Sequence, residues 1–116
     1  MDKETKTMKI WVDDIREAPE GYIWCKSTNE FLRYFRRNFD FLYGNIELLD
    51  LDHDAGDYAK EGGDYIEILK ELERLSHKRV YHNAICDITF RLHSMNPVGV
   101  QNMRAIIQRN AWKEIC

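Results

Sequence analysis

Residues 46–54 read IELLDLDHD, and this stretch does most to decide the fold. The run Ile46–Leu51 is largely apolar and has the length of a buried strand. The polar residues Asp52, His53 and Asp54 follow it without a linker. In open α/β sheets, ligands bind at the carboxyl ends of parallel strands. The stretch therefore predicts a strand of such a sheet together with one part of its ligand site.

The same arrangement occurs twice more in the chain. Met8–Val12 reads as a short buried strand that ends in Asp13 and Asp14, and the strand expected over 87–92 ends in His93 and Ser94. Parallel strands bring their carboxyl ends to a common edge, so the three polar clusters are expected to form one pocket.

The remaining segments alternate between strand and helix patterns. Tyr22–Cys25 is rich in aromatic and β-branched residues and predicts a second strand. Ser27 and Glu30 have the spacing of a capping box, which predicts that a helix begins there. Its expected apolar face consists of Phe31, Leu32, Phe35 and Phe39.

Two further helices are expected in the second half of the chain. One runs over residues 65–76, and the last begins at Asn96, with Pro97 in its first turn. The buried stripe expected on the last helix is Met103, Ile106, Ile107 and Ala111. Residues 78–84 fit either part of a strand or a connection.

This order of elements predicts an α/β protein, a three-layer sandwich with a mostly parallel sheet of four or five strands. Residues 14–20 leave little room for a helix between the first two strands. Residues 8–116 are expected to form a single domain after a flexible tail, residues 1–7.

Composition limits the classes of function. A net charge of −3 argues against a protein that coats nucleic acid through bulk charge, but it allows a local site for a nucleotide or an RNA end. Three cysteines without C-x-x-C spacing favour a reducing compartment, with Cys25 and Cys86 buried in strands. We find neither a leader-like apolar segment nor a run of about 20 apolar residues, so we expect a cytoplasmic protein without a membrane contact.

The acidic clusters predict a metal site. Asp13 and Asp14 repel each other when both are ionised, and a divalent cation relieves that repulsion. With Asp52 or Asp54 they form a candidate oxygen site for Mg²⁺ or Mn²⁺. The alternative is that two acids simply begin a loop.

His53 and His93 are the candidates for proton transfer, because imidazole titrates close to neutral pH. The alternative for each is a hydrogen-bonded structural histidine, which is the role expected of His77 and His82.

The start of the last helix predicts a phosphate site. Its free backbone amides and positive dipole end attract anions. The residues expected to contribute are Arg16, Ser94, Asn96, Gly99 and Asn102. Ordinary capping explains Asn96 equally well, and Arg16 also fits a solvated loop. The loop 52–64 carries three glycines and is a candidate lid.

At these residues the chain resembles the cyclic-phosphate processing receiver-like domains. The resemblance rests on Trp11-Val12-Asp13-Asp14-Ile15-Arg16, Leu51-Asp52-His53-Asp54-Ala55-Gly56, Gly63-Asp64-Tyr65 and His93-Ser94-Met95-Asn96-Pro97-Val98-Gly99 with Asn102-Met103. It implies a receiver-like (flavodoxin-like) topology, Asp13 and Asp14 as a metal pair, and Asp52 at the phosphoacceptor-like position. Unlike signalling receivers, the chain has His53 and Asp54 after that position and no clear lysine after a fifth strand.

The main hypothesis is a phosphoesterase that opens a cyclic phosphate, on an RNA 2′,3′ end or a cyclic nucleotide, to a monoester. His53, His93 and Asp52 are its candidate catalytic residues. One alternative is a module that binds a nucleotide or cyclic dinucleotide without turnover. A second is a degenerate receiver that acts as a signalling or interaction switch.

Overall fold

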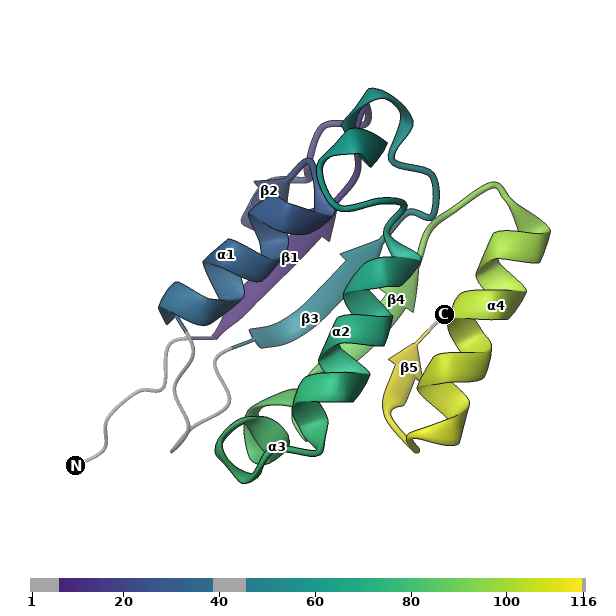
Figure 1. Ribbon diagram of the computed structural model, residues 1–116. Coiled ribbons are helices and arrows are strands. Elements are labelled where there is room, and N and C mark those ends of the chain that lie inside the picture. The colour runs from purple at the N-terminus through teal and green to yellow at the C-terminus, as the bar shows by residue number, and fades with distance from the viewer. Residues whose placement is uncertain (1–6, 39–45, 116) are drawn as a thin grey trace.

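A computed structural model describes residues 7–38 and 46–115, and Figure 1 shows their arrangement. Five strands form one sheet in the order β2-β1-β3-β4-β5, and every neighbouring pair is parallel. The strands are β1 (Met8–Val12), β2 (Tyr22–Cys25), β3 (Ile46–Leu51), β4 (Thr89–Leu92) and β5 (Lys113–Ile115). The predicted α/β class, the parallel sheet and the receiver-like strand order are confirmed, and β1, β2 and β3 have the predicted bounds.

The helices are α1 (Thr28–Asn38), α2 (Ile66–Ser76), α3 (Arg79–Cys86) and α4 (Pro97–Arg109), with a 3₁₀ helix η1 (Gly56–Lys60) in the loop after β3. The capping box at α1 is formed: the Glu30 amide donates to Ser27 Oγ (2.9 Å), and the Lys26 amide donates to the Glu30 carboxylate (2.7 Å). Phe31 and Phe35 are buried as expected, and Phe39 lies outside the described residues.

Residues 79–84 belong to helix α3, for which Lys78 is the N-cap, rather than to a strand or a simple connection. Helix α3 places Ala84 and Ile85 in the interior, so its burial has helical spacing. Cys86 therefore ends a helix and is half-buried, which corrects the strand expected around it, whereas Cys25 is buried in β2.

The last helix also ends earlier than its apolar stripe suggested. Helix α4 stops at Arg109, and Ala111 is exposed with a φ of 58°, outside the helix. This turn reverses the chain so that Trp112 is buried, with its ring stacked 5.1 Å from the Phe90 ring. The strand β5, which the pattern did not locate, follows directly.

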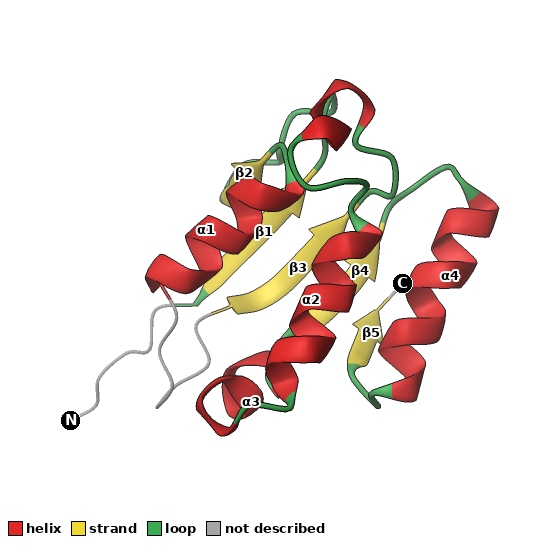
Figure 2. Ribbon diagram, in the orientation of Figure 1, coloured by secondary structure: helices red, strands yellow, loops and turns green. Residues whose placement is uncertain are grey.

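Helices α1, α2 and α4 cover the same face of the sheet, and α3 lies beside the end of α2 (Figure 2). One core cluster joins strand residues such as Ile10, Leu49 and Phe90 to Phe31, Leu69, Ile85 and Met103 of the helices. Within the described residues the third layer of the expected sandwich is therefore not formed. The physical reason is the β1–β2 connection: a right-handed crossover places it on the other face, and residues 13–21 contain no helix.

Candidate active site

The register of the sheet brings three site residues together. Val12, Leu51 and Leu92 are the last paired residues of β1, β3 and β4. Asp13, Asp52 and His93 each come next in the chain, and each backbone amide donates to the neighbouring strand. Because side chains alternate along a strand, these three lie on the face opposite the helices. Each offers a donor atom within 4.8 Å of the others.

His93 is held between two buried carboxylates. Its Nε2 atom lies 2.9 Å from Asp13 Oδ2, and its Nδ1 atom lies 2.7 Å from Asp50 Oδ1. Ionised carboxylates only accept hydrogen bonds, so an imidazolium that donates from both nitrogens satisfies this arrangement. The His93 side chain is 10% exposed, which leaves one edge of the ring close to solvent.

Trp11 and Arg16 complete the surroundings of His93. The Trp11 ring stacks on the imidazole with centroids 3.9 Å apart and planes 5° from parallel. Arg16 Nη1 donates to the His93 carbonyl oxygen (3.0 Å) and lies 3.9 Å from Asp13 Oδ2. The guanidinium of Arg16 is about half exposed, so its remaining donors can face a ligand.

Asp13 is the most strongly satisfied acid of the site. Burial alone would raise its pKa, but the amides of Arg16 and Ile15 donate to its Oδ1 atom, both at 2.9 Å. With the added contact to His93, these hydrogen bonds hold the pKa of Asp13 below its ordinary value. Asp13 is therefore ionised at neutral pH.

Asp14 has the opposite environment. Burial, followed by the negative charges of Asp13 and Asp52, raises the pKa of Asp14 above its ordinary value. The loop after β3 also presses against it, since a Cβ on Gly56 would lie 2.3 Å from Asp14 Oδ2. Gly56 has a φ of 55°, so both its backbone and its contact favour glycine.

The donor set fits a hard divalent cation. Asp13 and Asp52 offer carboxylate oxygens, which Mg²⁺ and Mn²⁺ prefer, whereas Asp14 does not belong to the group that Asp13 and Asp52 form with His93. The negative charges of Asp13 and Asp52 add to burial in raising the pKa of Asp14, so a cation bound beside these acids would favour the ionised form of Asp14.

Asp54, the fourth predicted metal ligand, belongs to a second cluster with His53 and Asp64. His53 Nδ1 lies 2.8 Å from Asp54 Oδ1, and the Asp64 carboxylate accepts from the Ala55 amide (2.9 Å). The His53 side chain is 14% exposed. If Nδ1 carries the proton shared with Asp54, Nε2 has a free lone pair.

The start of α4 adjoins this second cluster. Asn96 is the N-cap, its Oδ1 accepts from the Gly99 amide (3.0 Å), and its Nδ2 lies 3.4 Å from the Asp54 carboxylate. A Cβ on Gly99 would lie 2.5 Å from His53 Cγ, so the helix backbone packs directly on that ring. Ser94 Oγ accepts from the Asn96 amide (3.1 Å), while Asn102 is exposed on α4.

Two residues of the site were missed by the sequence patterns. Asp50 is fully buried in β3, and its second oxygen, Oδ2, has no hydrogen-bond partner, with Arg91 Nη1 3.8 Å away. The sequence did offer one indication, because Asp50 is an acid inside an otherwise apolar strand. A buried charge requires a partner, so such a residue indicates a buried polar contact. Trp11 carried no comparable signal, since an aromatic residue in a strand is ordinary.

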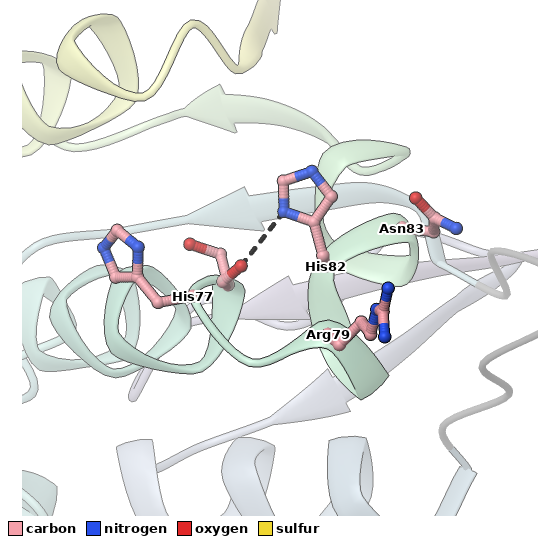
Figure 3. A pocket seen from close by; sticks show the side chains of 5 residues that line it. His77, Arg79, His82 and Asn83 are labelled. Carbon is pink, nitrogen blue, oxygen red and sulfur yellow. Dashed lines mark hydrogen bonds between the residues drawn. The ribbon is translucent and has the colours of Figure 1, made fainter.

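A hollow of about 430 Å³ lies elsewhere, at the corner between α2 and α3 (Figure 3). It is lined by Ser76, His77, Arg79, His82 and Asn83. His82 Nδ1 lies 3.0 Å from the Ser76 carbonyl oxygen and so caps the last turn of α2. His77 is the exposed C-cap residue of that helix. The contact of His82 agrees with the structural role expected of it, whereas the structural role of His77 stays a prediction.

Among residues 7–38 and 46–115, no helix has the length and apolar character that a membrane crossing requires. No curated protein and no solved structure matches the chain. Residues 8–109 match the family model described as the cyclic-phosphate processing receiver domain, which covers β1 through α4 and therefore both clusters. The chain belongs to the cyclic-phosphate processing receiver domain family.

Proposed function

We propose that this protein is a phosphoesterase that hydrolyses a cyclic phosphate, at an RNA 2′,3′ end or in a cyclic nucleotide, to a monoester. The observation that carries the proposal is the pair of histidines at neighbouring strand ends. The His53 ring contacts Asp54, and the His53 backbone amide donates to Asp52 Oδ1 (2.8 Å), while the His93 ring contacts Asp13 and Asp50. A base and an acid on two sides of a phosphoryl group are what hydrolysis of a phosphodiester needs.

In this proposal His53 is the general base. Its Nδ1–H donates to Asp54, which leaves the Nε2 lone pair to take a proton from water. The water oxygen forms the new bond to phosphorus as one ester P–O bond breaks. His93 is the general acid, and a ring proton that faces Asp13 or Asp50 passes to the departing ester oxygen.

The phosphate oxygens are assigned to Arg16, to Asn96 and Ser94, and to the amides near Gly99 at the start of α4. Asn102 is exposed on α4, so in this proposal it contacts a part of a longer ligand outside the phosphate group. The loop 52–64 is expected to act as a lid over this group, although its contact with Asp14 limits the motion of its first residues.

A divalent cation, Mg²⁺ or Mn²⁺, would be held by Asp13, Asp14 and Asp52, with Asp54 as a further ligand if the lid brings it close. When bound, it would withdraw charge from the phosphoryl oxygens. The residues themselves bind the phosphate, orient the two rings and exchange the protons.

The test is to incubate the protein with 2′,3′-cyclic nucleotides and with RNA that ends in a cyclic phosphate, in Mg²⁺, Mn²⁺ or EDTA. Mass spectrometry follows the gain of one water. We expect conversion to a monoester that EDTA slows strongly. Tight binding of all substrates without product would instead favour the non-catalytic binding module. Labelling of Asp52 by acetyl phosphate would favour the receiver switch.

A further inference from the structure

The face of the sheet that no described helix covers carries a regular pattern of side chains. We call it the open face and define it by two rows across the strands. The first row is Tyr22, Lys9, Leu48, Thr89 and Lys113, and the second is Trp24, Trp11, Asp50, Arg91 and Ile115. Residues in a row are neighbours in the sheet, and the β3 members in the middle, Leu48 and Asp50, are buried beneath the side chains around them.

Aromatic rings and cations lie together on the open face. Tyr22, Trp11 and Trp24 are half-buried, so part of each ring is accessible. Lys9 Nζ lies 5.9 Å from the Tyr22 ring centre, and Lys26 Nζ, just beyond β2, lies 4.6 Å from that of Trp24. The rings of Tyr22 and Trp24 therefore each have a positive charge beside them.

The charge of the open face differs from that of the whole chain. Lys9, Arg91 and Lys113 are exposed, whereas the acid in the two rows, Asp50, is fully buried against His93. The protein as a whole has a net charge of −3. The exposed cations of the two rows adjoin the acids Asp13 and Asp52 on the same face, so the positive charge is local and favours a specific anionic partner over general attraction to polyanions.

We propose that the open face binds single-stranded RNA, with bases stacked on Trp24 and Tyr22 and phosphates near Lys9, Arg91 and Lys113. Aromatic side chains on an exposed sheet stack unpaired bases, and interleaved cations follow the backbone. A duplex hides its base faces and cannot use such rings.

The open face is continuous with the strand-end cluster. Its second row lies two residues before Asp13, Asp52 and His93 on the same three strands, and the Trp11 ring stacks on the His93 imidazole. A strand bound across the rows can therefore present its end to the site. The identification of that end as the substrate rests on the proposed function. A 2′,3′-cyclic phosphate requires a ribose 2′-hydroxyl, so the strand is RNA.

The test measures binding without turnover. A fluorescent 10-nucleotide RNA with a 3′-hydroxyl end is titrated with the full chain in EDTA, and its anisotropy is followed. The Lys9→Glu/Lys113→Glu variant is expected to bind at least about 10-fold more weakly. The matched control, Lys70→Glu/Lys78→Glu, changes the charge equally at exposed lysines of α2 and at the start of α3 and should stay within about 2-fold.

Equal weakening by both pairs of substitutions would overturn the proposal, and so would a duplex that binds as tightly as the single strand. Circular dichroism checks each fold, and the Lys9→Gln/Lys113→Gln variant replaces the first pair if that pair fails to fold. Because the probe has no cyclic phosphate, the result is independent of hydrolysis. Binding at the open face without any hydrolysis of cyclic phosphates would remove the proposed function and leave this inference standing.

Discussion

Glu73 of α2 and Asp14 at the end of β1 are both partly buried carboxylates, but their surroundings shift their pKa values in opposite directions. Arg109 donates to Glu73 through Nε (2.8 Å) and Nη2 (2.7 Å), and this pairing, with a further bond from Asn110, lowers the pKa of Glu73 to about 2. Burial and then the charges of Asp13 and Asp52 raise the pKa of Asp14.

The opposite pKa shifts of Glu73 and Asp14 distinguish a structural ion pair from the candidate active site. Where α2 meets α4, the charge is neutralised and contributes to stability. At the strand ends, burial and the charges of Asp13 and Asp52 disfavour the ionised form of Asp14. The folded protein is therefore destabilised when Asp14 is ionised. An arrangement that opposes stability is expected where function requires it. Asp13 is intermediate, because His93 and two backbone amides satisfy it.

The largest expected effect comes from removing the partner of Asp13. The substitution His93→Ala leaves the Asp13 and Asp50 carboxylates buried and without their shared donor. We expect a loss of about 3–5 kcal/mol in the free energy of unfolding, measured by urea denaturation. The matched variant is His53→Ala, whose partner Asp54 is exposed and can be solvated.

Equal destabilisation by the two alanine variants would contradict the assignment of His93 as the central charge partner. Adding Asp50→Asn to His93→Ala should recover part of the loss, because it removes one of the two uncompensated charges.

The effect of the contact between the loop and Asp14 can be isolated with two glycines. Gly56 and Gly21 both have positive φ values, 55° and 88°, so alanine strains the backbone at either position. A Cβ at Gly56 meets Asp14 Oδ2, whereas a Cβ at Gly21 meets open space. We expect Gly56→Ala to lose about 1–2 kcal/mol more stability than Gly21→Ala and to weaken Mn²⁺ binding, measured by calorimetry. Equal effects on both quantities would show that the contact has no role.

Features that depend on neighbouring residues in the sequence were predictable, whereas features that depend on contacts between distant residues were not. The three strand ends were found from local patterns, because an apolar run followed by acids or histidines is visible in the sequence. The partnership of Asp50 with His93 joins residues 43 positions apart and depends on the register of two strands. Helix α3 and strand β5 are short, so their patterns span too few residues to separate helix from strand.

The absence of a helix on the open face follows from the same reasoning. Residues 14–20 were correctly expected to lack room for a helix, but the consequence for the third layer needs the handedness of the crossover and the strand order together.

The Asp14→Asn substitution gives a smaller effect with a defined pH dependence. Because the folded pKa of Asp14 is raised, its ionised form opposes folding at pH values above that folded pKa. In EDTA at pH 7 the asparagine variant should therefore melt at a higher temperature than the parent. The gain should vanish as the pH falls below the ordinary pKa of 3.8, where both states bind the proton. Thermal unfolding at pH 7 and at pH 3 checks this, and a lower melting temperature at pH 7 would contradict it.

The smallest effect is expected at Glu73, with the opposite sign. The folded pKa of Glu73 is lowered from 4.5 to about 2, so its contribution is present above about pH 4.5 and is lost as the pH falls toward 2. Glu73→Gln should therefore be less stable than the parent at pH 7 and nearly equal to it near pH 2. A stability difference that does not change with pH would show that the ion pair is not the cause.

The most direct test of the account compares hydrolysis of a 2′,3′-cyclic nucleotide by the parent protein and by Asp14→Asn in Mg²⁺, with mass spectrometry of the product. We expect a monoester from the parent and a rate at least about 100-fold lower from the variant, although the variant is the more stable protein in EDTA. Equal rates, or no product from either folded protein, would contradict the claim that the strand-end carboxylates are kept for catalysis.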